Sequence, residues 1–242
     1  MNRGIYSVAN GMVAAQKWMD TVTNNLANVS TTGFKRDGVA FNDAFASELR
    51  ADGGRGAPIG TLGSGPEQLS EYTVLGEVGP ISATGNPLDV AITIPDALFA
   101  VDTGDGAIRY TRNGSFSRNA DGQLVTQQGH LVLDDRERPI DLGEGQVEIS
   151  QSGELISNGA SIGKIGLFKG AFTKVGGNLF AGNGAAVESV ELTPKSLEGS
   201  NVNAIESMVQ MIQLNRTFEL SQKTISQQDD LTQRLIQSLQ DR

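Results

Sequence analysis

Apolar side chains recur along the first 29 residues of the chain at alternating spacings of three and four. This heptad pattern is typical of a helix that buries one narrow stripe against other helices. Polar residues fill the other faces, so the helix alone leaves its stripe in water. We therefore expect a helix that ends near Asn28 and packs on partner helices. The stripe runs through Ile5, Val8, Met12, Ala15, Met19, Val22, Leu26 and Val29.

A second helical pattern occupies residues 202–241, and Ser200 or Asn201 can cap its start. Polar side chains dilute this helix, so it must gain most of its stability from packing. It has two apolar stripes offset around its axis, which predicts contact with more than one neighbour. The first stripe is Val202, Ile205, Val209 and Ile212, and the second is Met211, Leu214, Phe218 and Ile225.

Between the two helices, short apolar runs alternate with turn residues, which is typical of β-strands. Asp105-Gly106, Asn113-Gly114 and Asp121-Gly122 are strong hairpin signals. Residues 122–126 (GQLVT) recur as residues 153–157 (GELIS), which predicts two hairpins of one design. Two copies are too few for a solenoid. Strands are expected at residues 88–92, 98–101, 108–112, 115–118, 123–126, 165–168, 179–180 and 187–192.

The fold class predicted from these patterns is mixed α and β. Terminal helices pack as a coiled-coil-like layer, and an all-β domain of short strands and hairpins is inserted between them. Residues 51–66 hold six Gly and two Pro, which predicts a flexible or extended loop. Residues 37–50 fit either a strand or a strand that turns into a short helix. The predicted domains are 1–36 (N-terminal helix and turn), 37–84 (extended arm and Gly-rich loop), 85–192 (β-rich middle domain) and 193–242 (C-terminal helix).

Composition excludes several functions. The chain of 242 residues has a net charge of −9 without a run of like charges, which argues against nucleic-acid and acidic-membrane partners. It has no Cys and one histidine, His130, so no Cys or His cluster can bind zinc. No apolar run is long enough to span a membrane, and no cleavable secretory signal is present. We expect a protein that is not an enzyme and needs no cofactor or metal.

Three asparagines crowd the end of the first helix, and Ser30, Thr31, Thr32 and Gly33 follow. They fit a frayed helix end, or amides that hydrogen-bond to neighbouring helices and fix their register. Phe34 supplies an apolar anchor just beyond the turn. The asparagines are Asn24, Asn25 and Asn28.

Both ends of the chain carry longer motifs. Residues 24–29 (NNLANV) and 32–36 (TGFKR) resemble the N-terminal signature of the bacterial flagellar rod and hook proteins. Residues 197–203 (LEGSNVN), 208–212 (MVQMI) and Arg216 resemble the C-terminal signature of that family. Residues 110–116 (YTRNGSF) and 121–126 (DGQLVT) are similar to a motif of its middle β domain. One departure is at residues 94–99 (IPDALF), where relatives have a Gly-rich approach to a Phe-Phe pair.

The resemblance implies a structural subunit of the flagellar basal-body rod, the axial drive shaft that transmits torque from motor to hook. Terminal helices of many copies would form an inner tube, with the β domains outside. The implied partners are copies of the chain, other rod and hook axial proteins, and the flagellar type III export apparatus. The implied location is the periplasm-spanning rod, reached without a cleaved signal.

The residues expected at the assembly interface come from both helices and the turn. They are Ile5, Val8, Met12, Met19, Val22, Asn24, Asn25, Leu26, Asn28, Phe34, Val202, Ile205, Val209, Ile212, Leu214, Phe218 and Ile225.

The alternative function is an extracellular or phage-tail-like β protein with a coiled-coil stalk, which would trimerise in isolation.

Overall fold

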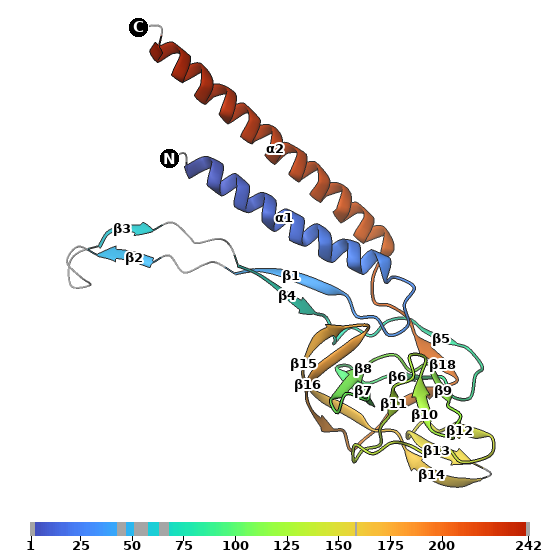
Figure 1. Ribbon diagram of the computed structural model, residues 1–242. Coiled ribbons are helices and arrows are strands. Elements are labelled where there is room, and N and C mark those ends of the chain that lie inside the picture. The colour runs from blue at the N-terminus through green and yellow to red at the C-terminus, as the bar shows by residue number, and fades with distance from the viewer. Residues whose placement is uncertain (1–2, 43–46, 51–57, 63–67, 158, 241–242) are drawn as a thin grey trace. The chain divides into compact units, whose positions relative to one another are not determined.

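The computed structural model describes residues 3–42, 47–50, 58–62, 68–157 and 159–240. A helix lies near each end of the chain, α1 at Arg3–Ala27 and α2 at Ala204–Gln240, and the described residues between them form strands and turns (Figure 1). The predicted mixed α and β class is therefore confirmed. Coiled-coil packing of the two helices stays a prediction.

The start of α2 differs from the sequence prediction. The helix begins at Ala204, and neither Ser200 nor Asn201 caps it. The Ser200 hydroxyl instead accepts a hydrogen bond from the Val202 amide before the helix, at 3.2 Å. The Asn201 side chain accepts one from the Arg36 amide, at 2.7 Å. Both side chains thus fix the segment that leads into the helix.

The chain forms two compact units. The first unit combines Met1–Leu26, Asp37–Tyr72 and Ala204–Arg242, and the second combines Ala27–Arg36 and Thr73–Asn203. The second unit therefore includes residues 27–36, 73–84 and 193–203, which lie outside the predicted middle domain.

Two strand pairs accompany the helices: β1 (Asp37–Asn42) pairs with β4 (Gln68–Thr73), and β2 (Ser47–Arg50) pairs with β3 (Pro58–Leu62). The described parts of residues 37–50 are therefore strand, and residues 43–46 lie outside the described residues. The strand β3 lies inside the segment expected to be a loop. The rest of that segment, residues 51–57 and 63–66, lies outside the described residues.

The second unit holds β5 to β18. One sheet has the order β15-β16-β8-β7-β11-β10-β9, and an additional pairing of β15 with β7 closes four of its strands into a ring. A three-stranded sheet β12-β13-β14 and the pairs β17–β6 and β18–β5 complete the unit. The strands are β5 (Ile81–Ala83), β6 (Val90–Ile92), β7 (Ala97–Asp102), β8 (Ile108–Thr111), β9 (Phe116–Arg118), β10 (Leu124–Thr126), β11 (Leu131–Val132), β12 (Val147–Ile149), β13 (Glu154–Ser157), β14 (Ala160–Lys164), β15 (Leu167–Gly176), β16 (Leu179–Ala186), β17 (Leu192–Pro194) and β18 (Ser196–Glu198).

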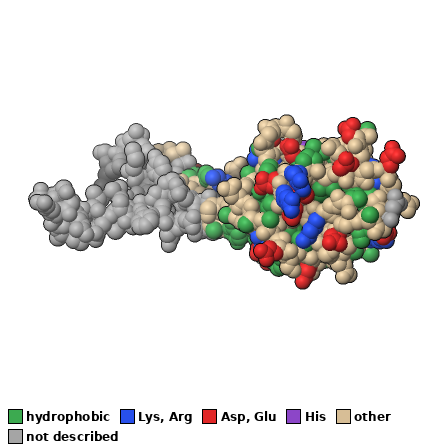
Figure 2. Space-filling model, turned by 90° about the horizontal axis from the view of Figure 1, so that it is seen from below, with side chains coloured by type: hydrophobic (Ala, Val, Ile, Leu, Met, Phe, Trp, Pro, Cys, Tyr) green, Lys and Arg blue, Asp and Glu red, His purple; other side chains and the backbone are tan. Residues whose placement is uncertain are grey.

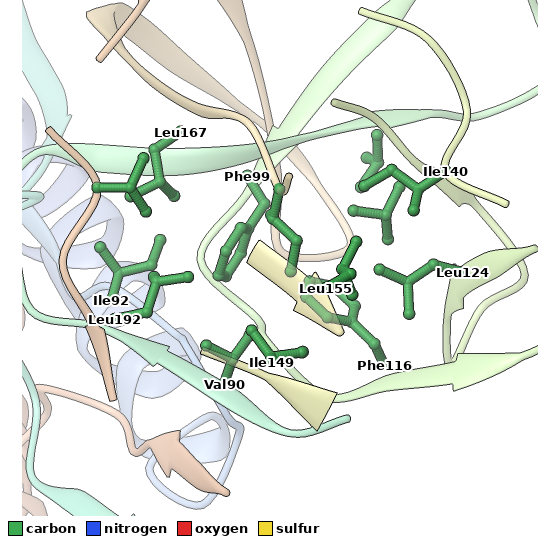
Figure 3. Close-up of a cluster of buried hydrophobic side chains, with 14 of the residues drawn as sticks. Val90, Ile92, Phe99, Phe116, Leu124, Ile140, Ile149, Leu155, Leu167 and Leu192 are labelled. Carbon is green, nitrogen blue, oxygen red and sulfur yellow. The ribbon is translucent and has the colours of Figure 1, made fainter. Parts of the chain in front are cut away.

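Strand β7 separates two hydrophobic clusters. Its residues Ala97, Phe99 and Val101 join a large cluster, in which the Phe99 and Phe116 rings meet edge to face with centroids 5.1 Å apart (Figure 3). Leu98 and Ala100 point the other way, into a smaller cluster. Because side chains alternate along a strand, a strand buried on both faces must be apolar throughout. Leu98 and Phe99 therefore serve opposite cores.

The predicted internal repeat is confirmed as two hairpins of one design. Gly122 lies between β9 and β10, Gly153 lies between β12 and β13, and they have φ angles of 82° and 80°. The amide of Gly122 donates to the Asn119 carbonyl at 3.2 Å, and the amide of Gly153 donates to the Ser150 carbonyl at 3.1 Å. Only glycine adopts this backbone conformation without strain, which explains why Gly recurs at this position.

Candidate functional site

Three segments that are far apart in the sequence meet inside the second unit, at the carboxylate of Glu198. The ammonium of Lys35 lies 2.7 Å from Glu198 Oε1, and Nε of Arg112 lies 2.6 Å from Oε2. The three side chains are between 0% and 1% exposed. We call Lys35, Arg112 and Glu198 the ion cluster.

The ion cluster has two cations and one carboxylate, and backbone groups complete its hydrogen bonding. Arg112 donates to the carbonyl of Ile92 at 3.0 Å, and also to the carbonyls of Ile94 and Ala97. Lys35 donates to the carbonyl of Glu77. Glu198 Oε1 also accepts from the amide of Gly79 at 2.9 Å. Backbone carbonyls thus take up the donors that one carboxylate cannot satisfy.

Burial sets the electrostatics of Lys35. Loss of solvent lowers the pKa of its ammonium below the usual 10.5, and the hydrogen bond with Glu198 opposes this shift. The nearby charge of Arg112 lowers the pKa further. Because the cluster has almost no exposed surface, it cannot meet a substrate. Its chemistry is that of a structural link between segments.

The backbone beside the cluster requires glycine at position 33. Gly33 has a φ of 66°, and a Cβ there would lie 2.6 Å from the carbonyl carbon of Arg112. Its amide donates to the carbonyl of Glu198 at 2.8 Å. A larger residue would push apart the two segments that Lys35 and Arg112 bring to Glu198.

Phe34 is buried by contacts within the chain itself. Its side chain is buried, and the ammonium of Lys174 lies 3.9 Å from its ring centroid. Lys174 also donates to the carbonyl of Lys35 at 3.1 Å. The anchor expected from the sequence is therefore present, but its observed contacts are intramolecular.

The three asparagines around the end of α1 have separate roles. The buried amide of Asn25 donates to the carbonyl of Asp37 and accepts from its N–H, both at 2.8 Å. Asn28 accepts from the hydroxyl of Thr31 at 3.1 Å, within the turn. Asn24 is exposed. The Asn25 side chain thus bonds to the backbone of Asp37 in the same chain, an arrangement that neither interpretation of the sequence foresaw.

The predicted interface positions on α1 are mostly half-buried. Val22 is buried, while Val8, Met12, Met19 and Leu26 are half-buried. The side chain of Ile5 lies outside the described part of the chain.

The two stripes of α2 differ in exposure. Ile205, Val209 and Ile212 of the first stripe are 75%, 48% and 54% exposed. Val202, predicted to belong to this stripe, precedes the helix and is half-buried. In the second stripe Leu214 is buried at 6%, and Met211, Phe218 and Ile225 are half-buried. One face of the helix therefore presents apolar side chains to water.

Comparison with known proteins places the chain in one family. Residues 5–35 match "Flagella basal body rod protein", residues 96–157 match "Flagellar hook protein FlgE/F/G D1 domain", and residues 193–238 match "Flagellar basal body rod FlgEFG protein C-terminal". The chain is 33% identical to the flagellar basal-body rod protein FlgG of Buchnera aphidicola subsp. Schizaphis graminum, over 94% of this chain and 96% of the relative. It is 32% identical to FlgF of Rhizobium meliloti, over 90% of each. The chain belongs to the flagellar basal-body rod protein family.

Within this family, two kinds of relative match equally well. The sequence motifs predict the proximal rod protein (FlgF) first, from residues 85–92 and 197–200, and the distal rod protein (FlgG) second, from residues 34–43. The chain is also 31% identical to FlgG of Bacillus subtilis, over 98% of both chains. The assignment to the proximal rod protein stays a prediction.

The ion cluster links the three signatures of the rod family. Lys35 comes from the N-terminal motif, Arg112 from the motif of the middle domain, and Glu198 from the C-terminal motif. Sequence reasoning missed this role, although charged residues inside otherwise apolar and Gly-rich motifs were a usable signal.

Other kinds of site are not found in the described part of this rod-family chain. No group of three or more His, Asp or Glu side chains there could hold a metal ion. No described helix is long and apolar enough to cross a membrane. Acidic and basic side chains are interspersed on the face shown in Figure 2.

Proposed function

We propose that this chain is a structural subunit of the bacterial flagellar basal-body rod. It self-assembles through its terminal helices into the axial shaft that transmits torque from motor to hook. The observation that carries the proposal is the exposed apolar stripe of α2, in which Val209 and Ile212 are about half exposed and Ile205 more so. Such a row costs free energy in water and becomes favourable when another helix covers it.

The assembly follows from the two helices. Each α2 carries more apolar positions than one neighbour covers, so α2 contacts α1 and a neighbouring copy at once. Repetition of that contact forms an inner tube of helices. Partners are further copies and other rod and hook proteins, which agrees with the names of the relatives.

Delivery of the subunit is part of the proposal. It leaves the cytoplasm through the flagellar type III export apparatus without a cleaved signal and takes its place in the periplasm-spanning rod. It performs no enzymatic reaction and needs no cofactor. Its work is mechanical, and the ion cluster keeps the β-rich unit intact under torque.

Cysteine cross-linking tests the proposal, since the chain has no Cys of its own. We expect Val209→Cys, labelled with a thiol-reactive photo-cross-linker, to yield cross-linked multimers in purified basal bodies. Asn215→Cys with the same label is the matched control, because Asn215 is an exposed polar residue on another face of α2, and it should yield far fewer multimers. A Val209→Cys chain that supports motility but never cross-links to a rod protein would contradict the proposed interface.

The coiled-coil stalk makes a different prediction in solution. A stalk protein trimerises on its own, whereas a rod subunit stays monomeric until it meets the growing end of the rod. Light scattering of the purified chain separates the two. A stable, highly helical trimer would favour the stalk.

A further inference from the structure

We infer that Glu198 completes the second unit, so that its β-strands become stably folded only when residues 192–201 have joined them. The second unit would then gain its stable fold together with this closing segment and not before it, however much of the preceding chain is present. This inference concerns the folding of one chain and goes beyond its role in the rod.

The first argument is charge. Before Glu198 arrives, closing the cores places Lys35 and Arg112 in a dry interior without the carboxylate that bonds to both. Asp96 also acts on the charge of Lys35, but it is the weakest of the influences on that side chain. Removing one partner from a buried ion pair is strongly destabilising because an uncompensated charge remains. The partly complete chain therefore cannot bury these cations at low cost, and its cores stay open.

The second argument is sequence separation. Glu198 lies 163 positions from Lys35 and 86 from Arg112, so its contacts are among the most non-local in the fold. The backbone of Glu198 also makes contacts that are distant in the sequence, because Glu198 pairs with Ile81 between strands β18 and β5. Ordering such contacts carries a loop-closure cost that is recovered only when they form together.

The third argument is the fit of the closing segment. β17 adds Leu192 to the large core opposite Ile92 of β6. Next to β18, the amide of Gly199 donates to the carbonyl of Pro80 at 2.8 Å. A Cβ on Gly79 would lie 2.1 Å from the carbonyl oxygen of Gly199, so the two backbones touch directly. The segment fills a site with no spare room.

Full-length variants test the charge argument. We expect Glu198→Ala to speed amide hydrogen exchange in β7 and β8 by about 100-fold or more, from the usual effect of breaking a buried pair. Glu148→Ala is the matched control, since Glu148 bonds to Lys195 at 3.0 Å on the surface, and it should change exchange little. Equal exchange in both variants would overturn the inference.

Two rescues separate lost charge from lost volume. Excess acetate should restore protection to the Glu198→Ala chain, and neutral acetamide should not. The triple variant Lys35→Met, Arg112→Met, Glu198→Met removes all three charges and should be protected better than Glu198→Ala alone. If the triple variant exchanges as fast as Glu198→Ala, uncompensated charge is not the cause.

The order of folding is tested on the unaltered chain. Pulse-labelling hydrogen exchange during refolding from urea should show β7 and β8 gaining protection in the same phase as β5 and β18. This result does not depend on whether any variant folds. Protection of β7 and β8 in an earlier phase than β18 would refute the proposed closing role of Glu198.

Discussion

The exposed stripe of α2 allows a direct test of assembly at Ile212. This side chain is 54% exposed in the single chain, and the neighbouring Leu214 is 6% exposed. If another subunit covers Ile212, the variant Ile212→Ala should weaken assembly without altering the fold of the second unit. Ile212→Asp should be more severe, because it places a charge in a contact that becomes dry.

The expected size follows from the exposed fraction. Full burial of an isoleucine is worth about 1.5–3 kcal/mol, and about half of that remains to be gained at Ile212. Truncation to Ala should therefore cost roughly 1 kcal/mol for each subunit contact, a several-fold change in each binding constant. In a polymer this loss recurs at every subunit, so the yield of rods falls more steeply than one contact suggests.

The assay pairs swarming and rod yield in cells with thermal unfolding of the purified chain. Ile212→Ala should reduce rod yield, Ile212→Asp should abolish it, and both should leave the melting temperature of the second unit unchanged. Gln213→Ala, an exposed polar neighbour on the same helix, is the control and should behave as the unaltered chain. Normal rod yield from Ile212→Asp would refute the interface, and a lower melting temperature would place Ile212 in a core of its own chain.

Three further changes have distinct expected results. Gly33→Ala should reduce the free energy of unfolding of the second unit by about a few kcal/mol and so lower its melting temperature, because Gly33 has a φ of 66° and the backbone of Arg112 leaves no room for a Cβ. An unchanged melting curve would contradict this. Leu26→Asp should impair rods in cells but leave the second unit stable, and normal flagella would exclude Leu26 from the interface. Burial alone would raise the pKa of Asp134, but hydrogen bonds from Arg138 and Arg136 hold it below 3.8. Asp134 therefore stabilises the fold above about pH 4, an effect lost on acidification through the folded-state pKa; Asp134→Asn should flatten this part of a curve of melting temperature against pH.

Features that depend on near neighbours in the sequence were predictable. The heptad spacing predicted a first helix ending near Asn28, and α1 ends at Ala27. The recurrence of Gly122 at Gly153 predicted two hairpins of one design, because a turn that needs φ > 0 leaves a visible residue.

Features that depend on distant contacts were not predictable. The pairing of Leu167 with Phe99, which closes the ring of strands, joins segments without any local turn signal. Asn25 was assigned to a frayed end or a helix interface, but its partner is the backbone of Asp37. The spacing of residues does not show which of several backbone groups will hydrogen-bond to a side-chain amide.

The ion cluster shows most clearly why the burial of charged residues is hard to predict from the sequence. Lys, Arg and Glu are mostly exposed in proteins, so a prediction from sequence places them on the surface unless a partner is known. At Lys35 and Arg112 the partner is Glu198, at the other end of the chain, and the pairing is invisible before the fold is known.

The positions of these residues separate two tasks within the rod-family signatures. Val209 and Ile212 lie on a helix of the first unit and expose apolar surface, so changes there should alter assembly and spare the thermal transition of the second unit. Lys35 and Glu198 lie in the second unit and expose almost none, so changes there should alter that transition first. The role of a signature residue in this chain is therefore inferred from the unit that contains it and from the exposed fraction of its side chain. When a variant lowers both the melting temperature of the second unit and the rod yield, the loss of rods is explained by the folding defect.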